Sequence, residues 1–179
     1  MFSPEKSVLV VIDVQDKLTA LMHEKDIFLK NIQILIQAAQ VLDIPILWSE
    51  HVPQRIGPTV ESVRRLMSCL KPVVKVSFGC CGAKQFTDAL AASKRRQVIL
   101  TGLETHVCVY QTAAQLLESK YAVQVVADAV SSRASFNKQI GLGRIQSLGG
   151  VITSTEMILF ELLKTAEHGQ FRNVLDLVR

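Results

Sequence analysis

Proline, glycine and aromatic residues are scarce in this sequence. Its 179 residues include 5 prolines and 9 glycines, and 6% of them are aromatic. This composition excludes collagen-like and low-complexity disordered chains, and it leaves few rings that could stack on nucleic-acid bases. No apolar run approaches the roughly 20 residues that a helix needs to cross a bilayer. Because 49% of the residues are hydrophobic, the sequence predicts a globular protein, and its length favours one domain over residues 1–179.

The four cysteines have neither the spacing nor the partners of a metal site. Cys69, Cys80, Cys81 and Cys108 include no CxxC pair and have no suitably spaced histidines, so a zinc site or a disulfide framework is not expected. We interpret the adjacent Cys80 and Cys81 as loop-packing residues rather than a redox pair. The first apolar run stops at Asp13, which does not fit a signal peptide, and we expect a reducing, cytoplasmic location.

Positive charge is in modest excess but is dispersed. The formal net charge is +4 and the pI is about 9.0, yet the longest basic run is Lys94, Arg95 and Arg96. This run precedes an apolar strand pattern, which favours a solvated helix end over a nucleic-acid surface. We therefore expect a small-molecule substrate, with no nucleic-acid or membrane partner.

Short apolar, β-branched runs recur along the chain, separated by segments with helical spacing. Continuous apolar runs are typical of strands covered on both faces of a parallel sheet, and strands that alternate with helices form right-handed βαβ units. The fold class is therefore α/β, a doubly wound, three-layer sheet of about six strands. The expected strands are residues 7–12, 44–48, 73–76, 97–101, 122–127 and 151–153, and the expected helices are 28–42, 63–70, 86–90, 107–117, 136–148, 155–166 and 168–178.

Chemically active side chains stand where three of these strands end. Asp13 follows the first strand, Lys75 lies in the third, and the fourth leads through a loop to Cys108. Ligands of open parallel sheets bind beyond the carboxyl ends of the strands. Each residue also has a structural interpretation: Asp13 as a helix or loop cap, Lys75 as an edge-strand lysine whose stem reaches water, and Cys108 as a small buried hydrophobe.

Cys108 is more informative by its position than by its type. At a helix N-terminus, free N–H groups and the helix dipole lower the pKa of a thiol and favour the nucleophilic thiolate. A lysine nearby would favour the thiolate further, and a carboxylate could accept the thiol proton. Cys108, Asp13 and Lys75 together would supply a nucleophile, a base and a positive group.

With these three residues in place, the chain resembles the isochorismatase-like cysteine hydrolase superfamily, and most closely its uncharacterised isochorismatase-domain branch. The similarity runs in order from about Lys6 to the final helix. The matching segments are residues 10–18 (VVIDVQDKL), 46–50 with the later Gly57, Pro58 and Thr59, 73–78 (VVKVSF), 100–112 (LTGLETHVCVYQT), 127–133 (ADAVSSR) and 149–163 (GGVITSTEMILFELL).

The resemblance implies a three-layer Rossmann-like fold with a six-stranded parallel sheet flanked by helices, and a catalytic triad of Asp13, Lys75 and Cys108. It also implies a cis peptide bond between Leu103 and Glu104. That bond would direct the backbone N–H groups of Glu104 and Cys108 towards one oxygen, forming an oxyanion hole.

The second strand's exit departs from the nicotinamidases of this superfamily, which bind a metal there through Asp and His. Here the stretch reads Ser49, Glu50, His51, Val52, Pro53, and the side chain of Pro53 cannot ligate. We therefore expect no metal and no cofactor. Isochorismatases proper cleave a vinyl ether without needing the cysteine, so the presence of Cys108 argues for attack on a carbonyl or amide.

The leading hypothesis is a metal-independent cysteine hydrolase that cleaves an amide-like C–N bond of a small molecule through an acyl-enzyme. The alternatives are a binding or scaffold module with a vestigial site, and an isochorismatase-type ether hydrolase. Leu18, Trp48, Phe78 and His106 are the expected pocket lining, although His106 could equally be satisfied by the backbone. Family resemblance implies a homo-oligomer, at least a dimer. Apolar residues of the last two helices would either form its interface or pack on the sheet: Phe160, Leu163, Phe171 and Leu175.

Overall fold

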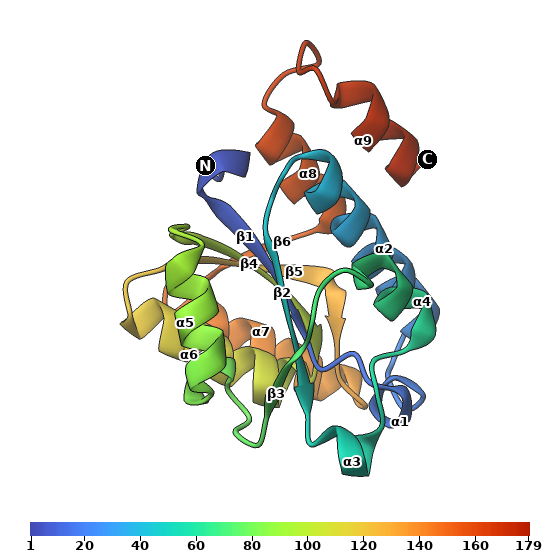
Figure 1. Ribbon diagram of the computed structural model, residues 1–179, viewed down its shortest axis with the longest axis vertical. Coiled ribbons are helices and arrows are strands. Elements are labelled where there is room, and N and C mark those ends of the chain that lie inside the picture. Colours follow the sequence, from blue (N-terminus) through green and yellow to red (C-terminus); the bar gives the residue numbers. More distant parts are fainter.

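Six parallel strands form one sheet in the computed structural model, which describes residues 1–179 (Figure 1). Their order is β3-β2-β1-β4-β5-β6, so the strands on either side of β1 are added in opposite directions. This is the doubly wound arrangement expected from the alternating pattern. The strands are β1 (Ser7–Ile12), β2 (Ile46–His51), β3 (Val73–Lys75), β4 (Gln97–Leu103), β5 (Ala122–Ser131) and β6 (Val151–Thr153).

Helices cover both faces of the sheet, which explains why the strands are apolar throughout (Figure 1). One core cluster joins the sheet to α2, α8 and α9, and the other joins it to α5, α6 and α7. Every residue of β1 is buried. The α-helices are α1 (Asp16–Thr19), α2 (Lys25–Val41), α3 (Pro53–Ile56), α4 (Glu61–Arg64), α5 (Lys84–Ala92), α6 (Tyr110–Glu118), α7 (Ser135–Ser147), α8 (Thr155–Leu163) and α9 (Phe171–Val178).

The helix expected over residues 63–70 is wrong in extent. Its apolar residues do point inward, and Val63 and Met67 are buried. The chain nevertheless forms only the single turn α4 and a 3₁₀ turn, Arg65–Met67. Apolar spacing of three and four fits a 3₁₀ turn as well as an α-helix over so short a stretch, so the pattern alone could not separate them.

The C-terminal helices use their apolar residues within the chain. Phe160 and Phe171 face each other with ring centroids 6.4 Å apart and pack against the core. Leu163 is 2% exposed. These three residues therefore pack within the chain, and α9 folds back onto the helices α2 and α8 rather than onto the sheet itself.

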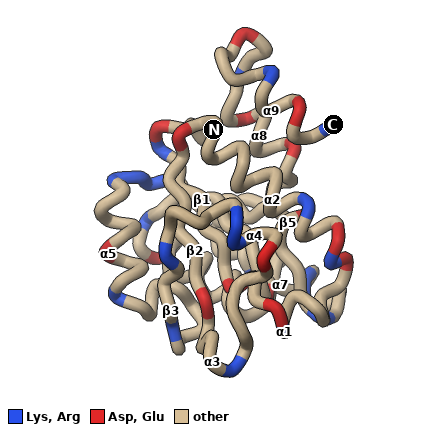
Figure 2. The backbone as a smooth tube through the Cα atoms, turned by 45° about the vertical axis from the view of Figure 1, so that its right-hand side comes forward, with Lys and Arg blue, Asp and Glu red and all other residues tan.

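Charged residues are interspersed along the whole chain rather than collected on one face (Figure 2). None of the helices has the length and apolar character that crossing a membrane requires.

The change of direction in strand order lies between β1 and β4, and it places Asp13 beside the loop that follows β4. The two strands pair from Ser7 opposite Gln97 to Ile12 opposite Gly102. A Cβ at Gly102 would lie 2.1 Å from the carbonyl oxygen of Ile12, and the residue has a φ of +117°. Glycine is therefore required there, since both the close approach and the backbone conformation exclude a side chain.

Candidate active site

Asp13 and Lys75 form a buried ion pair at the carboxyl edge of the sheet. The ammonium Nζ of Lys75 lies 2.6 Å from Oδ2 of Asp13, and both side chains are 0% exposed. Two charges are tolerated away from water only when they are paired and hydrogen-bonded. Nζ also donates to the carbonyl oxygens of Ser77, at 3.2 Å, and Phe78, at 2.9 Å. All three ammonium protons are thus used, which fixes Lys75 as a stationary positive charge.

The length of the lysine side chain is needed for this contact. Asp13 follows β1, whereas Lys75 ends β3, and β2 lies between them. Neighbouring strands are about 4.8 Å apart, so the side chain must span roughly two such spacings. The interpretation of Lys75 as an edge-strand lysine that reaches water is therefore wrong. Its side chain crosses above β2 instead, which the apolar neighbours in the strand did not reveal.

Ser49, on the strand between them, holds the other carboxylate oxygen. Its Oγ donates to Oδ1 of Asp13 at 2.7 Å, and Ser49 is 1% exposed. The thiol of Cys80 lies 3.6 Å from the same Oγ. Asp13 itself has a φ of +50°, in the left-handed region that Asp tolerates better than most residues, and this turn ends β1.

Cys108 lies in a tight turn between β4 and α6 rather than at the first residue of a regular α-helix. The turn is a π-helix, Thr105–Val109, a form that occurs frequently at functional sites. The peptide bond between Leu103 and Glu104, just before it, is cis. Helix α7 packs directly on this turn. A Cβ at Gly141 would lie 2.9 Å from the Cα of His106, so a glycine in α7 permits the close contact.

The pKa of the Cys108 thiol is raised, not lowered as its position in the sequence predicts. It is raised to about 12, first by burial and then by the negative Asp13 carboxylate, while Lys75 acts in the opposite direction. A raised pKa favours the neutral thiol. The lowering effect of Lys75 is present as expected, but burial and Asp13 outweigh it.

Glu104 contributes a backbone donor and a buried carboxylate to the same loop. Its N–H makes no backbone hydrogen bond, and it directly follows the cis bond. Its carboxylate, on a residue 8% exposed, pairs with Nε of Arg133 at 3.1 Å. His106 lies beside it, with Nδ1 3.0 Å from Oγ of Ser132. His106 is therefore held by a side chain, an interaction that sequence reasoning did not identify.

Phe78 and His51 lie next to the ion pair at the strand exits. Phe78 is 51% exposed, and its ring centroid is 5.4 Å from that of His51. Gln15 fixes the His51 backbone from both sides, because it accepts from the N–H and donates to the carbonyl. Leu18 is half-buried and packs against the α2 side of the core. Cys108 is 7% exposed, so the nucleophile has limited contact with solvent.

Trp48 is a correction to the expected pocket lining. It lies on the opposite face of the sheet from Cys108, in the core cluster that includes Val63 and Met67. Successive strand residues point to opposite faces, so when Ser49 faces Asp13, Trp48 must face away.

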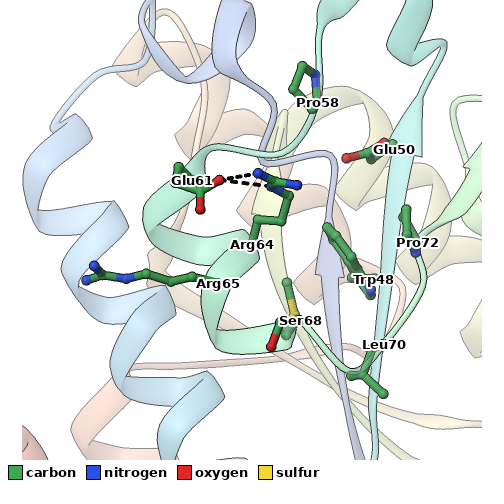
Figure 3. A pocket seen from close by; sticks show the side chains of 10 residues that line it. Trp48, Glu50, Pro58, Glu61, Arg64, Arg65, Ser68, Leu70 and Pro72 are labelled. Carbon is green, nitrogen blue, oxygen red and sulfur yellow. Dashed lines mark hydrogen bonds and ion pairs between the residues drawn. The ribbon is translucent and has the colours of Figure 1, made fainter.

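A separate cavity of about 620 Å³ opens on that face, and Figure 3 shows Trp48 among its lining residues with Glu50 and Arg64. Cys108 does not line this cavity. Asp13 and Lys75 do not line it either.

No group of three or more His, Cys, Asp or Glu side chains lies close enough to hold a metal ion. Two contributors to the site were missed in the sequence: Ser49 and Thr112, whose Oγ1 donates to the carbonyl oxygen of Cys108 at 2.7 Å. A serine at the end of an otherwise apolar strand was the available signal for the first.

Comparison with known proteins agrees with this architecture. Residues 7–157 match the isochorismatase domain family. The secreted isochorismatase effector Isc1 of Phytophthora sojae is 33% identical over 181 residues, covering 98% of this chain and 86% of that protein.

Two solved structures share the fold. The structure of MAR1 ribonuclease from Caenorhabditis elegans is 32% identical, with a TM-score of 0.90 over 99% of this chain and 91% of that chain. The YcaC gene product of Escherichia coli, described as an octameric hydrolase of unknown specificity, has a TM-score of 0.89 over 98% of this chain and 94% of that one. At 20% identity, that second likeness concerns the fold alone. On the family match and the relatives above 30% identity, the chain belongs to the isochorismatase-like hydrolase family.

Proposed function

We propose that the protein is a metal-independent cysteine hydrolase that cleaves an amide-like C–N bond of a small molecule. Cys108 is the nucleophile, Asp13 is the general base and acid, and Lys75 is a fixed positive charge. The observation that carries the proposal is the buried contact between Asp13 and Lys75, 2.6 Å long, beside a thiol whose pKa that same carboxylate raises.

Acylation begins with the neutral thiol. Asp13 accepts the proton as Sγ of Cys108 bonds to the carbonyl carbon, so the thiolate never has to exist free in the buried site. The carbonyl oxygen becomes an oxyanion that accepts hydrogen bonds from the N–H groups of Glu104 and Cys108. Losing one such donor typically lowers turnover by ~10²- to 10³-fold. The C–N bond then breaks, and the proton on Asp13 passes to the leaving amine.

In deacylation, water replaces the thiol as the nucleophile and Asp13 again acts first as the base. Water attacks the thioester carbon while Asp13 takes one of its protons, the C–S bond breaks, and the proton returns to the sulfur as the acid product leaves. The sum is one amide and one water converted to one acid and one amine. Lys75 makes three hydrogen bonds within the site, and its positive charge offsets the negative charge that Asp13 carries whenever its carboxyl group is ionised.

The test is a panel of small primary and secondary amides with the purified chain and its Cys108→Ala variant. We expect release of amine or ammonia from at least one amide class, and loss of that release in the variant. Cys69→Ala is the matched control, because Cys69 is an exposed free cysteine. Amide hydrolysis that survives Cys108→Ala would contradict the proposal.

The same panel addresses the other classes. A vinyl ether and an RNA oligonucleotide belong in it, the latter because a relative is described as a ribonuclease. A panel without any turnover, combined with stoichiometric binding of a metabolite, would favour a binding module and overturn the enzyme proposal.

We also propose a homo-oligomer of at least two chains and a cytoplasmic location. An octameric fold neighbour supports the first, whereas a relative named as secreted weighs against the second. Light scattering on the purified chain and fractionation of cells that express it are the direct measurements.

A further inference from the structure

We propose that Ser49, supported by Cys80, is a positioning residue that orients the Asp13 carboxylate towards Cys108. This inference deepens the proposed function and rests on it. Neither residue touches the reacting atoms in the mechanism above, so both would act through Asp13.

Asp13 is anchored by one donor on each oxygen. Lys75 occupies Oδ2 at 2.6 Å, and Ser49 occupies Oδ1 at 2.7 Å. With Lys75 alone, the carboxylate could rotate about its one contact, and a base must be held in register with the proton that it accepts. The second anchor removes that rotation, leaving lone pairs directed at the thiol.

The directions of these hydrogen bonds are determined by the available protons. An ionised carboxylate only accepts, so the single hydroxyl proton of Ser49 must point to Asp13. The remaining contact of that hydroxyl, with Cys80 Sγ at 3.6 Å, must then be donated by the thiol. Burial raises the pKa of Cys80, which keeps this thiol protonated and able to donate. The order is therefore Cys80 to Ser49 to Asp13.

Cys80 also links this chain of hydrogen bonds to the backbone of the nucleophile. Its N–H donates to Oγ1 of Thr112 at 2.9 Å, and that hydroxyl donates to the carbonyl oxygen of Cys108 at 2.7 Å. The base and the nucleophile are thus connected through Ser49, Cys80 and Thr112, all of which are buried. A residue that only filled space would not need both its thiol and its N–H paired in this way.

Removal of the Ser49 hydroxyl is expected to have two effects. Asp13 raises the pKa of Cys108 partly through a hydrogen bond to it, so a carboxylate that is no longer held towards the thiol raises that pKa less. Alkylation of Cys108 by iodoacetamide at a fixed pH should therefore accelerate by roughly tenfold, the factor typical of such a bond. At the same time kcat should fall by roughly ten- to a hundredfold with KM little changed, because the misaligned base acts in the chemical step.

The experiment compares Ser49→Ala with Ser49→Thr, which restores a hydroxyl, and with Ser7→Ala. Ser7 is equally buried but lies at the opposite end of β1 and bonds Gln97. Alkylation is followed by mass spectrometry of the tryptic peptide 97–120, whose sole cysteine is Cys108. Thermal unfolding confirms that each variant is folded. We expect faster alkylation and lowered kcat in Ser49→Ala, near-normal values in Ser49→Thr and Ser7→Ala, and a smaller effect of the same sign in Cys80→Ala.

Alkylation that is unchanged or slower in a folded Ser49→Ala variant overturns the positioning role. Since alkylation needs no substrate, it separates the two proposals. If Ser49→Ala speeds alkylation but hydrolysis survives Cys108→Ala, the proposed function fails while Ser49 still governs Asp13. If hydrolysis requires Cys108 but Ser49→Ala changes neither alkylation nor kcat, only the role of Ser49 fails.

Discussion

Replacing Asp13 with Asn should move thiol reactivity and turnover in opposite directions. Asp13 raises the pKa of Cys108 through its charge and through a hydrogen bond, whereas Lys75 lowers it. The Asn side chain carries no charge, so Lys75 is left to act alone and the pKa must fall below about 12. At a fixed pH near neutrality a larger fraction of Cys108 is then thiolate, and its alkylation should accelerate.

Turnover should fall in the same variant because no group remains to take the thiol proton and return it to the amine. Removing a general base typically costs ~10²- to 10⁴-fold in rate. The fold should also weaken, since breaking a buried ion pair by removing one partner costs about 3–5 kcal/mol. A urea titration gives this loss, and kinetic measurements belong below the unfolding transition.

The assay measures iodoacetamide labelling of peptide 97–120 against pH, alongside amide hydrolysis. Asp16→Asn is the matched control, because Asp16 is exposed and begins α1 only three residues away. Faster labelling with lost turnover is the expected pair of results. Slower labelling would refute the electrostatic reasoning, and full turnover would remove Asp13 as the base.

Two further outcomes follow from the same structure. The pKa values of Cys80, Cys81 and Cys108 are raised from 9.0 by burial, to about 11 for Cys81 and about 12 for Cys108. Above pH 9 the unfolded chain therefore holds fewer protons than the folded one, and the free energy of unfolding should decline between pH 9 and 12. Urea titrations at several pH values should show a shallower decline in Cys108→Ala. An equal decline in that variant would contradict this cause. Gly102→Ala should destabilise the fold by more than about 1–3 kcal/mol. The new Cβ would lie 2.1 Å from the Ile12 carbonyl oxygen, and the residue has a φ of +117°. An unchanged unfolding midpoint would argue against this strand contact.

Elements with an uninterrupted apolar pattern were predictable from the sequence. β1 and β6 span the residues expected, 7–12 and 151–153, because each is bounded by residues that break the pattern. β5 extends to Ser131, beyond the expected end at residue 127. Asp128 lies within it as a polar interruption, and its carboxylate accepts from the N–H and hydroxyl of Thr155. That partner is 27 residues away, so local pattern could not reveal it.

The site divides in the same way between what is local and what is not. Strand topology alone was enough to predict that reactive groups lie together at the strand exits. Asp13 and Lys75 are in contact there. The side on which Trp48 points depends on strand register, and the sign of the Cys108 pKa shift depends on how deeply the thiol is covered. Both are set by tertiary packing, which is why the sequence predicted a lowered pKa for Cys108 where burial and Asp13 raise it.

The most direct test of the central claim is a crystal structure with an aldehyde analogue of whichever amide the panel identifies. A nucleophilic Cys108 adds to such a carbonyl and leaves a tetrahedral oxygen that mimics the reaction intermediate. The account predicts a covalent bond from Sγ of Cys108 and an oxygen within hydrogen-bond reach of the Glu104 N–H. An analogue bound without that bond, or found only in the cavity beside Trp48, would contradict it.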